Sequence, residues 1–140
     1  MARYLVDANV LLEATKPAPD ERVVGWLQRH EPDLTVDPIV LGEIRVGILL
    51  LPPGRRRKRL EHWFEEGVRG LQCISWEAST GLRWAELLAT LRAAGRAMPI
   101  KDSLIGATAL SHDLAIATLN SRDFEAAGVT IVDPAAGSSN

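Results

Sequence analysis

The sequence predicts an α/β fold built as a three-layer α/β/α sandwich with a central, mostly parallel sheet. Short apolar runs typical of buried strands alternate along the chain with longer helical patterns. These runs carry no polar face, as expected for a parallel sheet covered by helices on both sides. The length of 140 residues fits one domain with a substantial core. We expect that domain to span residues 1–134, with a flexible C-terminal tail at 135–140.

The elements are expected in the following order. Five short apolar runs predict strands at residues 3–6, 34–36, 71–75, 114–118 and 129–132. Six longer stretches predict helices at residues 8–15, 20–30, 38–50, 55–68, 77–94 and 100–111. Asp20 and the pair Asp37-Pro38 are typical of helix N-termini. Pro52-Pro53 and Gly95 are typical of positions just beyond a helix C-terminus.

Composition excludes several classes of protein. The chain has no long apolar run, so no membrane span is expected. Its N-terminus, MARYLVDANV, lacks the residue order of a secretory signal, and we expect a cytoplasmic protein. Cys73 is the only cysteine, which rules out an internal disulfide and predicts a small buried hydrophobe. The net charge of −2 does not indicate a nucleic-acid-binding protein, although GRRRKR at residues 54–59 is strongly basic.

Acidic and amide side chains follow two of the expected strands. Asp7 comes directly after the first strand, and Asn120 and Asp123 come after the fourth. Ligands of open parallel sheets bind beyond the carboxyl ends of the strands. These three residues are therefore expected at the edge of the sheet where a ligand would lie.

Two further acids interrupt apolar helices. Glu43 lies in PIVLGEIRVGILL, which is apolar nearly all round and is expected to be well buried. At helical spacing, Glu43 shares a stripe with Ile39, Val46 and Leu50. In IKDSLIGATAL, Asp102 is in line with the apolar and small residues of its helix, close to the helix start. A buried carboxylate costs several kcal/mol unless it is paired or bound to a cation.

Each acid also has a structural explanation. Asp7 could cap the helix after it, and Asp102 could interact with the dipole of its own helix. Glu43 could pair with an arginine, and Asp123 could be a loop or cap residue. These explanations weaken when the acids are considered together, because no basic residues occupy comparable core positions. Unneutralised carboxylates raise each other's pKa values, and a bound divalent cation removes that cost.

The ligand types select the metal. All the candidate donors are oxygens, and no cysteine or histidine stands at metal-ligand spacing, which argues against zinc. Hard oxygen ligands suit Mg²⁺ or Mn²⁺. Enzymes that catalyse phosphoryl transfer commonly use such an ion held by carboxylates.

Four motifs in this order resemble those of a known family. They are YLVDANVLLEA, PIVLGEIRVGILLLPPGRRRKRLEHWF, PIKDSLIGATAL and IATLNSRDFEAAGVTIVDP. The chain resembles PIN-domain proteins from about residue 3 to residue 134, and most closely the VapC/FitB-type ribonuclease toxins of prokaryotic type II toxin–antitoxin systems. The resemblance implies a PIN-like α/β/α fold, in agreement with the pattern of strands and helices.

The resemblance also implies roles for the acids. Asp7 and Asp102 would be the principal Mg²⁺ ligands, and Glu43 would help to hold a metal-bound water or a second ion. Asn120 occupies the position of the family's fourth acid, and Asp123 is the alternative for that role. Leu119 stands where an arginine is common, which removes one possible phosphate contact. The loss of one negative charge at Asn120 favours one ion over two.

The implied activity is that of a Mg²⁺-dependent endoribonuclease, with Mn²⁺ as a possible substitute, that hydrolyses RNA phosphodiester bonds with a metal-activated water. Such toxins usually form homodimers and larger hetero-oligomers with a small VapB-like antitoxin. The antitoxin tail commonly lies across the acidic cleft and presents an arginine to the carboxylates. No membrane partner is implied.

Two other functions fit some of these features. A catalytically degenerate PIN domain would bind RNA or protein without cleavage, but retention of Asp7, Glu43 and Asp102 argues against it. A receiver-like phosphoacceptor also uses an acidic Mg²⁺ pocket. It needs paired acids after the first strand and a lysine after the last, and this chain has neither.

The basic block and the remaining polar residues complete the set of candidates. The cations of the basic block could contact RNA phosphates, contact an antitoxin, or simply be a solvated surface. They are Arg55, Arg56, Arg57, Lys58 and Arg59. The four tryptophans could stack on bases but are more often core residues at such positions. Thr15, Ser103 and Thr118 could assist the site or simply cap helices, and the three histidines show no catalytic arrangement.

Overall fold

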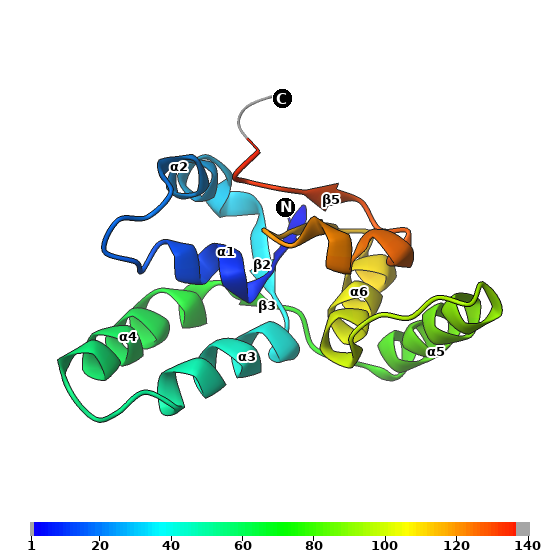
Figure 1. The fold of residues 1–140 in the computed structure, drawn as a ribbon, viewed down its shortest axis with the longest axis horizontal. Coiled ribbons are helices and arrows are strands. Elements are labelled where there is room, and N and C mark those ends of the chain that lie inside the picture. Colours follow the sequence, from blue (N-terminus) through cyan, green and yellow to red (C-terminus); the bar gives the residue numbers. More distant parts are fainter. Residues whose placement is uncertain (1, 137–140) are drawn as a thin grey trace.

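A computed structural model describes residues 2–136 and shows a parallel sheet between two layers of helices (Figure 1). Within this range the strands are β1 (Tyr4–Val6), β2 (Leu34–Val36), β3 (Gln72–Cys73), β4 (Ala115–Ala117) and β5 (Ile131–Val132). The helices are α1 (Ala8–Glu13), α2 (Glu21–His30), α3 (Pro38–Leu49), α4 (Arg55–Glu66), α5 (Ala78–Ala93) and α6 (Ile100–His112). Short 3₁₀ turns follow at Glu31–Asp33, Val68–Gly70, Ser121–Asp123 and Glu125–Ala127.

The sheet has the strand order β3-β2-β1-β4-β5, and every neighbouring pair is parallel. The chain moves outward from β1 to β3 and then crosses back to β4 on the other side of β1. Right-handed crossovers therefore place α5 and α6 on the face opposite α1 and α4, as Figure 1 shows. The order reverses between β1 and β4, which makes the carboxyl ends of these two strands the place where a ligand is expected.

The core fills both sides of this sheet with aliphatic side chains. Leu5, Val36 and Ile116 are fully buried in three adjacent strands, and Phe124 is the bulkiest side chain with no exposed surface. On the second face, α5 and α6 pack closely. A Cβ added to Gly106 of α6 would lie 3.6 Å from Ala127 and 3.7 Å from Leu87. These are ordinary van der Waals distances, so an alanine would also fit at this position.

The expected fold is confirmed, with strands shorter than the apolar runs suggested. Asp20 and Asp37 cap α2 and α3 through side-chain oxygens, and Pro38 occupies the first turn of α3. Gly95 follows α5 with φ of 68°, and its N–H donates to the carbonyl of Arg92. This left-handed position is where a residue without Cβ costs least.

Two expectations about burial are wrong. Cys73 is exposed, because β3 is a two-residue strand at the edge of the sheet. Helix α3 is not buried all round: Val46, Leu49 and Leu50 are 55%, 47% and 79% exposed. Its buried side is formed by Val40, Ile44 and Ile48, so the stripe that Glu43 shares with Val46 and Leu50 faces outward over its second half.

The boundary of the domain stays a prediction. Ala135 packs against the core, and residues 137–140 of the expected tail lie outside the described residues. Among the described helices, none is long and apolar enough to cross a membrane.

Candidate active site

Asp7 stands at the carboxyl end of β1 and begins the site. Its Oδ1 accepts a hydrogen bond of 2.8 Å from the N–H of Ala8, so the expected capping role is real. Its Oδ2 accepts a second bond of 2.8 Å from the hydroxyl of Thr118. Burial raises the pKa of Asp7, the Thr118 hydrogen bond opposes that rise, and the charge of Glu43 adds to it. Asp7 is therefore both the N-cap of α1 and a largely buried carboxylate that is hydrogen-bonded to the segment after β4.

A hydrogen-bond network ties the end of β1 to the segment after β4. The amide of Asn9 donates to Thr118 Oγ1 at 3.4 Å, and Asn9 Oδ1 accepts from the N–H of Leu119 at 3.1 Å. The N–H of Asn120 also donates to Thr118 Oγ1, at 3.0 Å. Thr118 thus contacts Asp7, as the first of its two expected roles requires. Asn9 was missed, and its place in the first turn after Asp7 was the only signal.

Asp102 enters the site from the opposite face, in the first turn of α6. Its side chain is mostly buried, with 8% of the residue exposed, in line with the buried residues Ile105, Gly106 and Ala109. Burial and the charges of Asp7 and Asp123 raise the pKa of Asp102 to about 6, while Lys101 opposes the rise. The charge of Glu43 acts on both Asp7 and Asp102, and the charges of Asp7 and Asp123 act on Asp102, so the four carboxylates lie close together. We call Asp7, Glu43, Asp102 and Asp123 the acid cluster.

Glu43 projects into the acid cluster from α3, but it is paired. Its Oε2 accepts a bond of 2.8 Å from the ammonium of Lys101, whereas Oε1 is buried without a hydrogen-bond partner in the described part of the chain. The expectation that no basic residue neutralises the acids is therefore wrong. The partner is Lys101 on α6, which reaches Glu43 from an exposed position, whereas only core positions of the sequence lack a neutralising cation.

Asn120 and Asp123 occupy different surroundings after β4. Asn120 is exposed and joins the network through its backbone N–H. Asp123 is half-buried in the 3₁₀ turn, and its charge raises the pKa of Asp102. On this geometry Asp123 interacts with the acid cluster through its side chain.

The oxygen donors of the acid cluster fit Mg²⁺. Mg²⁺ keeps several of its waters and is held by one or two carboxylates, so it needs no complete cage of protein ligands. Within residues 2–136, no three His, Cys, Asp or Glu side chains are placed to hold a metal ion together, so binding would need the carboxylates to move closer or water to complete the shell. The partnerless Oε1 of Glu43 and the raised pKa of Asp102 are both observations that a nearby cation would resolve.

Comparison with known proteins decides the family. The PIN-domain family model matches residues 4–129 of the chain. The chain belongs to the PIN-domain family. Toxin FitB of Neisseria gonorrhoeae is 30% identical over 134 residues, which span 93% of this chain and 96% of FitB. Plasmid stability protein StbB of Pseudomonas syringae is 33% identical over the same share of each chain, and a VapC ribonuclease of Sinorhizobium fredii is 30% identical.

Solved structures agree with this assignment to the VapC/FitB type. The FitAcB structure from Neisseria gonorrhoeae matches with a TM-score of 0.87 at 30% identity, covering 94% of this chain and 97% of that one. A FitAB structure bound to a DNA fragment matches with a TM-score of 0.90 at 28% identity, covering 97% and 98%. The similarity therefore extends over almost the whole PIN domain.

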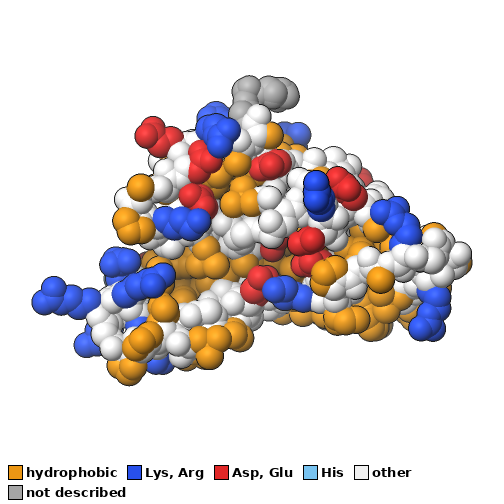
Figure 2. Space-filling view, viewed as in Figure 1, with side chains coloured by type: hydrophobic (Ala, Val, Ile, Leu, Met, Phe, Trp, Pro, Cys, Tyr) orange, Lys and Arg blue, Asp and Glu red, His pale blue; other side chains and the backbone are white. Residues whose placement is uncertain are grey.

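The basic block forms the first turns of α4 in this PIN domain. Arg57 donates to the carbonyl of Leu51 and lies 3.5 Å from Glu61, which also contacts Arg45. The other cations of the block are exposed and have no ion pair within the described residues; they are Arg55, Arg56, Lys58 and Arg59. Figure 2 shows lysine and arginine side chains gathered at the α4 end of the molecule, apart from the aspartate and glutamate side chains near the middle of the view.

The remaining candidates have structural roles. Trp26 is buried and meets Tyr4 edge-on, and Trp63 packs against the core. Ser103 accepts from the Trp84 indole at 2.9 Å and donates to the carbonyl of Ile100, so it is occupied. Thr15 donates to the carbonyl of Leu12 at the end of α1. The preference for core over base stacking is confirmed for Trp26.

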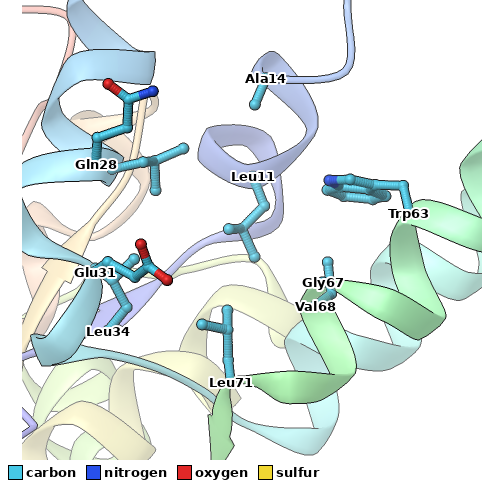
Figure 3. A pocket seen from close by; sticks show the side chains of 10 residues that line it. Leu11, Ala14, Gln28, Glu31, Leu34, Trp63, Gly67, Val68 and Leu71 are labelled. Carbon is cyan, nitrogen blue, oxygen red and sulfur yellow. The ribbon is translucent and has the colours of Figure 1, made fainter.

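An apolar pocket of about 200 Å³ lies between α1, α2 and α4, away from the acid cluster. Figure 3 shows Leu11 and Trp63 facing each other across it, with Leu71 below. Glu31 is its only acidic lining residue. The pocket therefore lacks the paired carboxylates that hydrolytic chemistry needs.

Proposed function

We propose that this PIN domain is a Mg²⁺-dependent endoribonuclease and the toxin of a toxin–antitoxin pair. The observation that carries the proposal is the acid cluster, in which carboxylates from both faces of the sheet interact at the carboxyl ends of β1 and β4. Relatives named as a VapC ribonuclease and as toxin FitB support the same assignment. Mn²⁺ is the expected substitute ion, because it shares the preference for oxygen ligands.

Asp7 and Asp102 are the residues that would hold the ion, with Glu43 beside them. A bound Mg²⁺ would lower the pKa of a water molecule and stabilise charge on the phosphate. The protein itself holds the carboxylates in defined positions. The two hydrogen bonds to Asp7 hold both of its oxygens in place, one from each strand end. The raised pKa of Asp102 belongs to the metal-free site, and a bound ion would hold this carboxyl in its deprotonated, ligating form.

The exposed cations of α4 are the proposed contact for the RNA backbone. Gly54 begins this helix without a side-chain cap, so no cap side chain accepts from the first N–H groups of α4, which lie at the same end of the helix as the cations. Four cations without ion pairs next to free N–H groups suit phosphate oxygens. The RNA strand would then lie between the basic end of α4 and the acid cluster.

A small antitoxin is the proposed protein partner. The FitAcB structure and the FitAB structure bound to DNA are toxin–antitoxin complexes, and the same arrangement is proposed here. An antitoxin arginine would neutralise the acid cluster and exclude RNA. We also propose a homodimer, because Val46, Leu49 and Leu50 leave an apolar stripe on α3 exposed. A cytoplasmic location fits this set of partners.

RNA cleavage by the purified protein tests the proposal. Total cellular RNA would be incubated with Mg²⁺, with Mn²⁺ and with EDTA, alongside the variants Asp7→Asn and Asp102→Asn. Metal-dependent cleavage by the wild type alone is the expected result. Full activity of either variant would overturn the site assignment. RNA binding without cleavage, in a preparation shown by mass to contain no antitoxin, would favour the degenerate PIN domain instead.

A further inference from the structure

The contact between Lys101 and Glu43 places a positive charge inside the acid cluster. Lys101 Nζ lies 2.8 Å from Glu43 Oε2, and this ion pair joins two helices that contact each other, α6 and α3. Figure 2 shows a lysine or arginine side chain directly beside the acidic patch. The charge of Lys101 also acts on Asp7 and Asp102, whose pKa values it lowers. One ammonium therefore interacts with three carboxylates of the site.

A divalent ion would interact with the same carboxylates. The second oxygen of Glu43, Oε1, is buried and has no partner among the described residues, so the Lys101 bond satisfies only half of this carboxylate. The Lys101 side chain is 51% exposed and stands at the end of a flexible stem, which lets it leave Glu43 at little cost. Because the Lys101 ammonium and a divalent ion are both positive and interact with the same carboxylates, each weakens the binding of the other.

We propose that Lys101 is an internal counter-cation of the acid cluster that competes with the divalent ion and sets its affinity. This inference rests on the proposed function. In the metal-free protein the ammonium neutralises Glu43 and limits repulsion among the carboxylates. When the ion arrives, Lys101 gives up Glu43, and its side chain becomes free at the rim of the site. Lys101 thus keeps metal affinity low without itself being a ligand.

The same geometry allows a second role, in which Lys101 orients Glu43 for the ion and strengthens binding. The two roles predict opposite signs. A single charge acting on a divalent ion across several ångströms at a water-exposed site changes affinity roughly tenfold. Holding one glutamate rotamer is a smaller effect, since fixing a side chain involves about 1 kcal/mol, roughly fivefold in affinity. The charge effect is expected to dominate.

Titration of the full-length protein with Mn²⁺, followed by electron paramagnetic resonance of the free ion, measures the affinity without RNA or catalysis. Lys101→Met removes the charge at nearly constant length, and we expect it to bind Mn²⁺ roughly tenfold more tightly than the wild type. Lys101→Arg keeps the charge and should bind like the wild type. Lys16→Met is the matched control, because Lys16 also lies 2.9 Å from a glutamate, Glu13, and does not act on the acid cluster.

The outcomes separate this inference from the proposed function. Tighter binding by Lys101→Met, with Lys101→Arg and Lys16→Met unchanged, would support it. Equal or weaker binding by Lys101→Met would overturn it and leave the ribonuclease proposal standing. Equal tightening by Lys16→Met would also overturn it, because net charge would then be the cause. Absence of Mn²⁺ binding in the wild type would overturn both proposals. Circular dichroism of each variant checks that it is folded.

Discussion

The hydroxyl of Thr118 donates a 2.8 Å hydrogen bond to Asp7 across 111 positions of sequence, and this bond joins the ends of β1 and β4, the two parallel strands between which the strand order reverses. A second threonine makes an equivalent bond elsewhere: Thr108 donates to the buried carboxylate of Asp37 at 2.7 Å. Both aspartates follow a strand and cap a helix. Only Asp7 belongs to the acid cluster. Comparing the Thr118–Asp7 and Thr108–Asp37 bonds therefore distinguishes effects on stability from effects on catalysis.

Replacing Thr118 with valine is expected to reduce both stability and activity. The variant leaves Asp7 Oδ2 buried without a donor, which costs about 1–3 kcal/mol in unfolding free energy. It also removes a bond that lowers the pKa of Asp7, so this pKa should rise further. Urea unfolding and RNA cleavage over a pH series measure the two effects. Thr118→Ser keeps the hydroxyl and should restore both.

Thr108→Val is the control for this prediction. It removes the equivalent bond to Asp37 and should lower the unfolding free energy by a similar amount, about 1–3 kcal/mol. Because Asp37 lies outside the acid cluster, kcat/KM of the folded protein should stay unchanged. A loss of kcat/KM as large as that of Thr118→Val would show that stability alone explains both variants.

The raised pKa of Asp102 predicts a pH-dependent cost to stability in the absence of metal. The folded carboxyl binds its proton more tightly than the unfolded one, with a pKa of about 6 against an ordinary 3.8. Its contribution to stability is therefore lost as the pH rises from about 4 to about 6. Asp102→Asn should be more stable than the wild type by about 1–2 kcal/mol at pH 7.5, after allowance for solvent screening, and equally stable at pH 4.

Chemical unfolding in EDTA at the two pH values tests this prediction. The raised pKa of Asp37 acts in the same direction but is present in both proteins, so the difference reports Asp102 together with its repulsion of Asp7. Added Mg²⁺ should stabilise the wild type at pH 7.5 and have little effect on Asp102→Asn. Equal stabilities at pH 7.5 in EDTA would contradict the raised pKa.

The sequence was sufficient to predict the order of strands and helices, because apolar runs, caps and turn residues such as Asp37-Pro38 and Gly95 act locally. It also singled out Asp7 and Asp102, which the structure brings close together, because a carboxylate at a strand end or on a buried helix stripe is costly without a partner. Lys101 and Asn9 were missed, since their contacts are set by the packing of distant elements. The exposure of Val46 and Leu50 depends on which side of α3 meets the sheet, which composition does not determine.

The fourth residue of the site is predicted to be Asp123 rather than Asn120. Asp123 interacts electrostatically with Asp102, whereas Asn120 is exposed and joins the network through its backbone. Asp123→Asn should lower the pKa of Asp102, followed by carboxyl NMR, and reduce cleavage roughly tenfold or more. Asn120→Ala keeps the backbone bond and should have a much smaller effect. The reverse ranking of the two variants would assign the position to Asn120.

RNA contact by the basic end of α4 predicts a change in the salt dependence of binding. Arg56 and Arg59 are exposed and unpaired within the described residues, so Arg56→Ala/Arg59→Ala should remove two phosphate contacts. The slope of log affinity against log salt should become shallower by about 1.4, at roughly 0.7 for each contact to single-stranded RNA. Binding would be measured in EDTA with Asp102→Asn as the background, so that no cleavage occurs. Arg22→Ala/Arg83→Ala, which removes two arginines already paired with acids, should leave the slope unchanged. An equal change in both double variants would mean that overall charge, rather than α4, attracts the RNA.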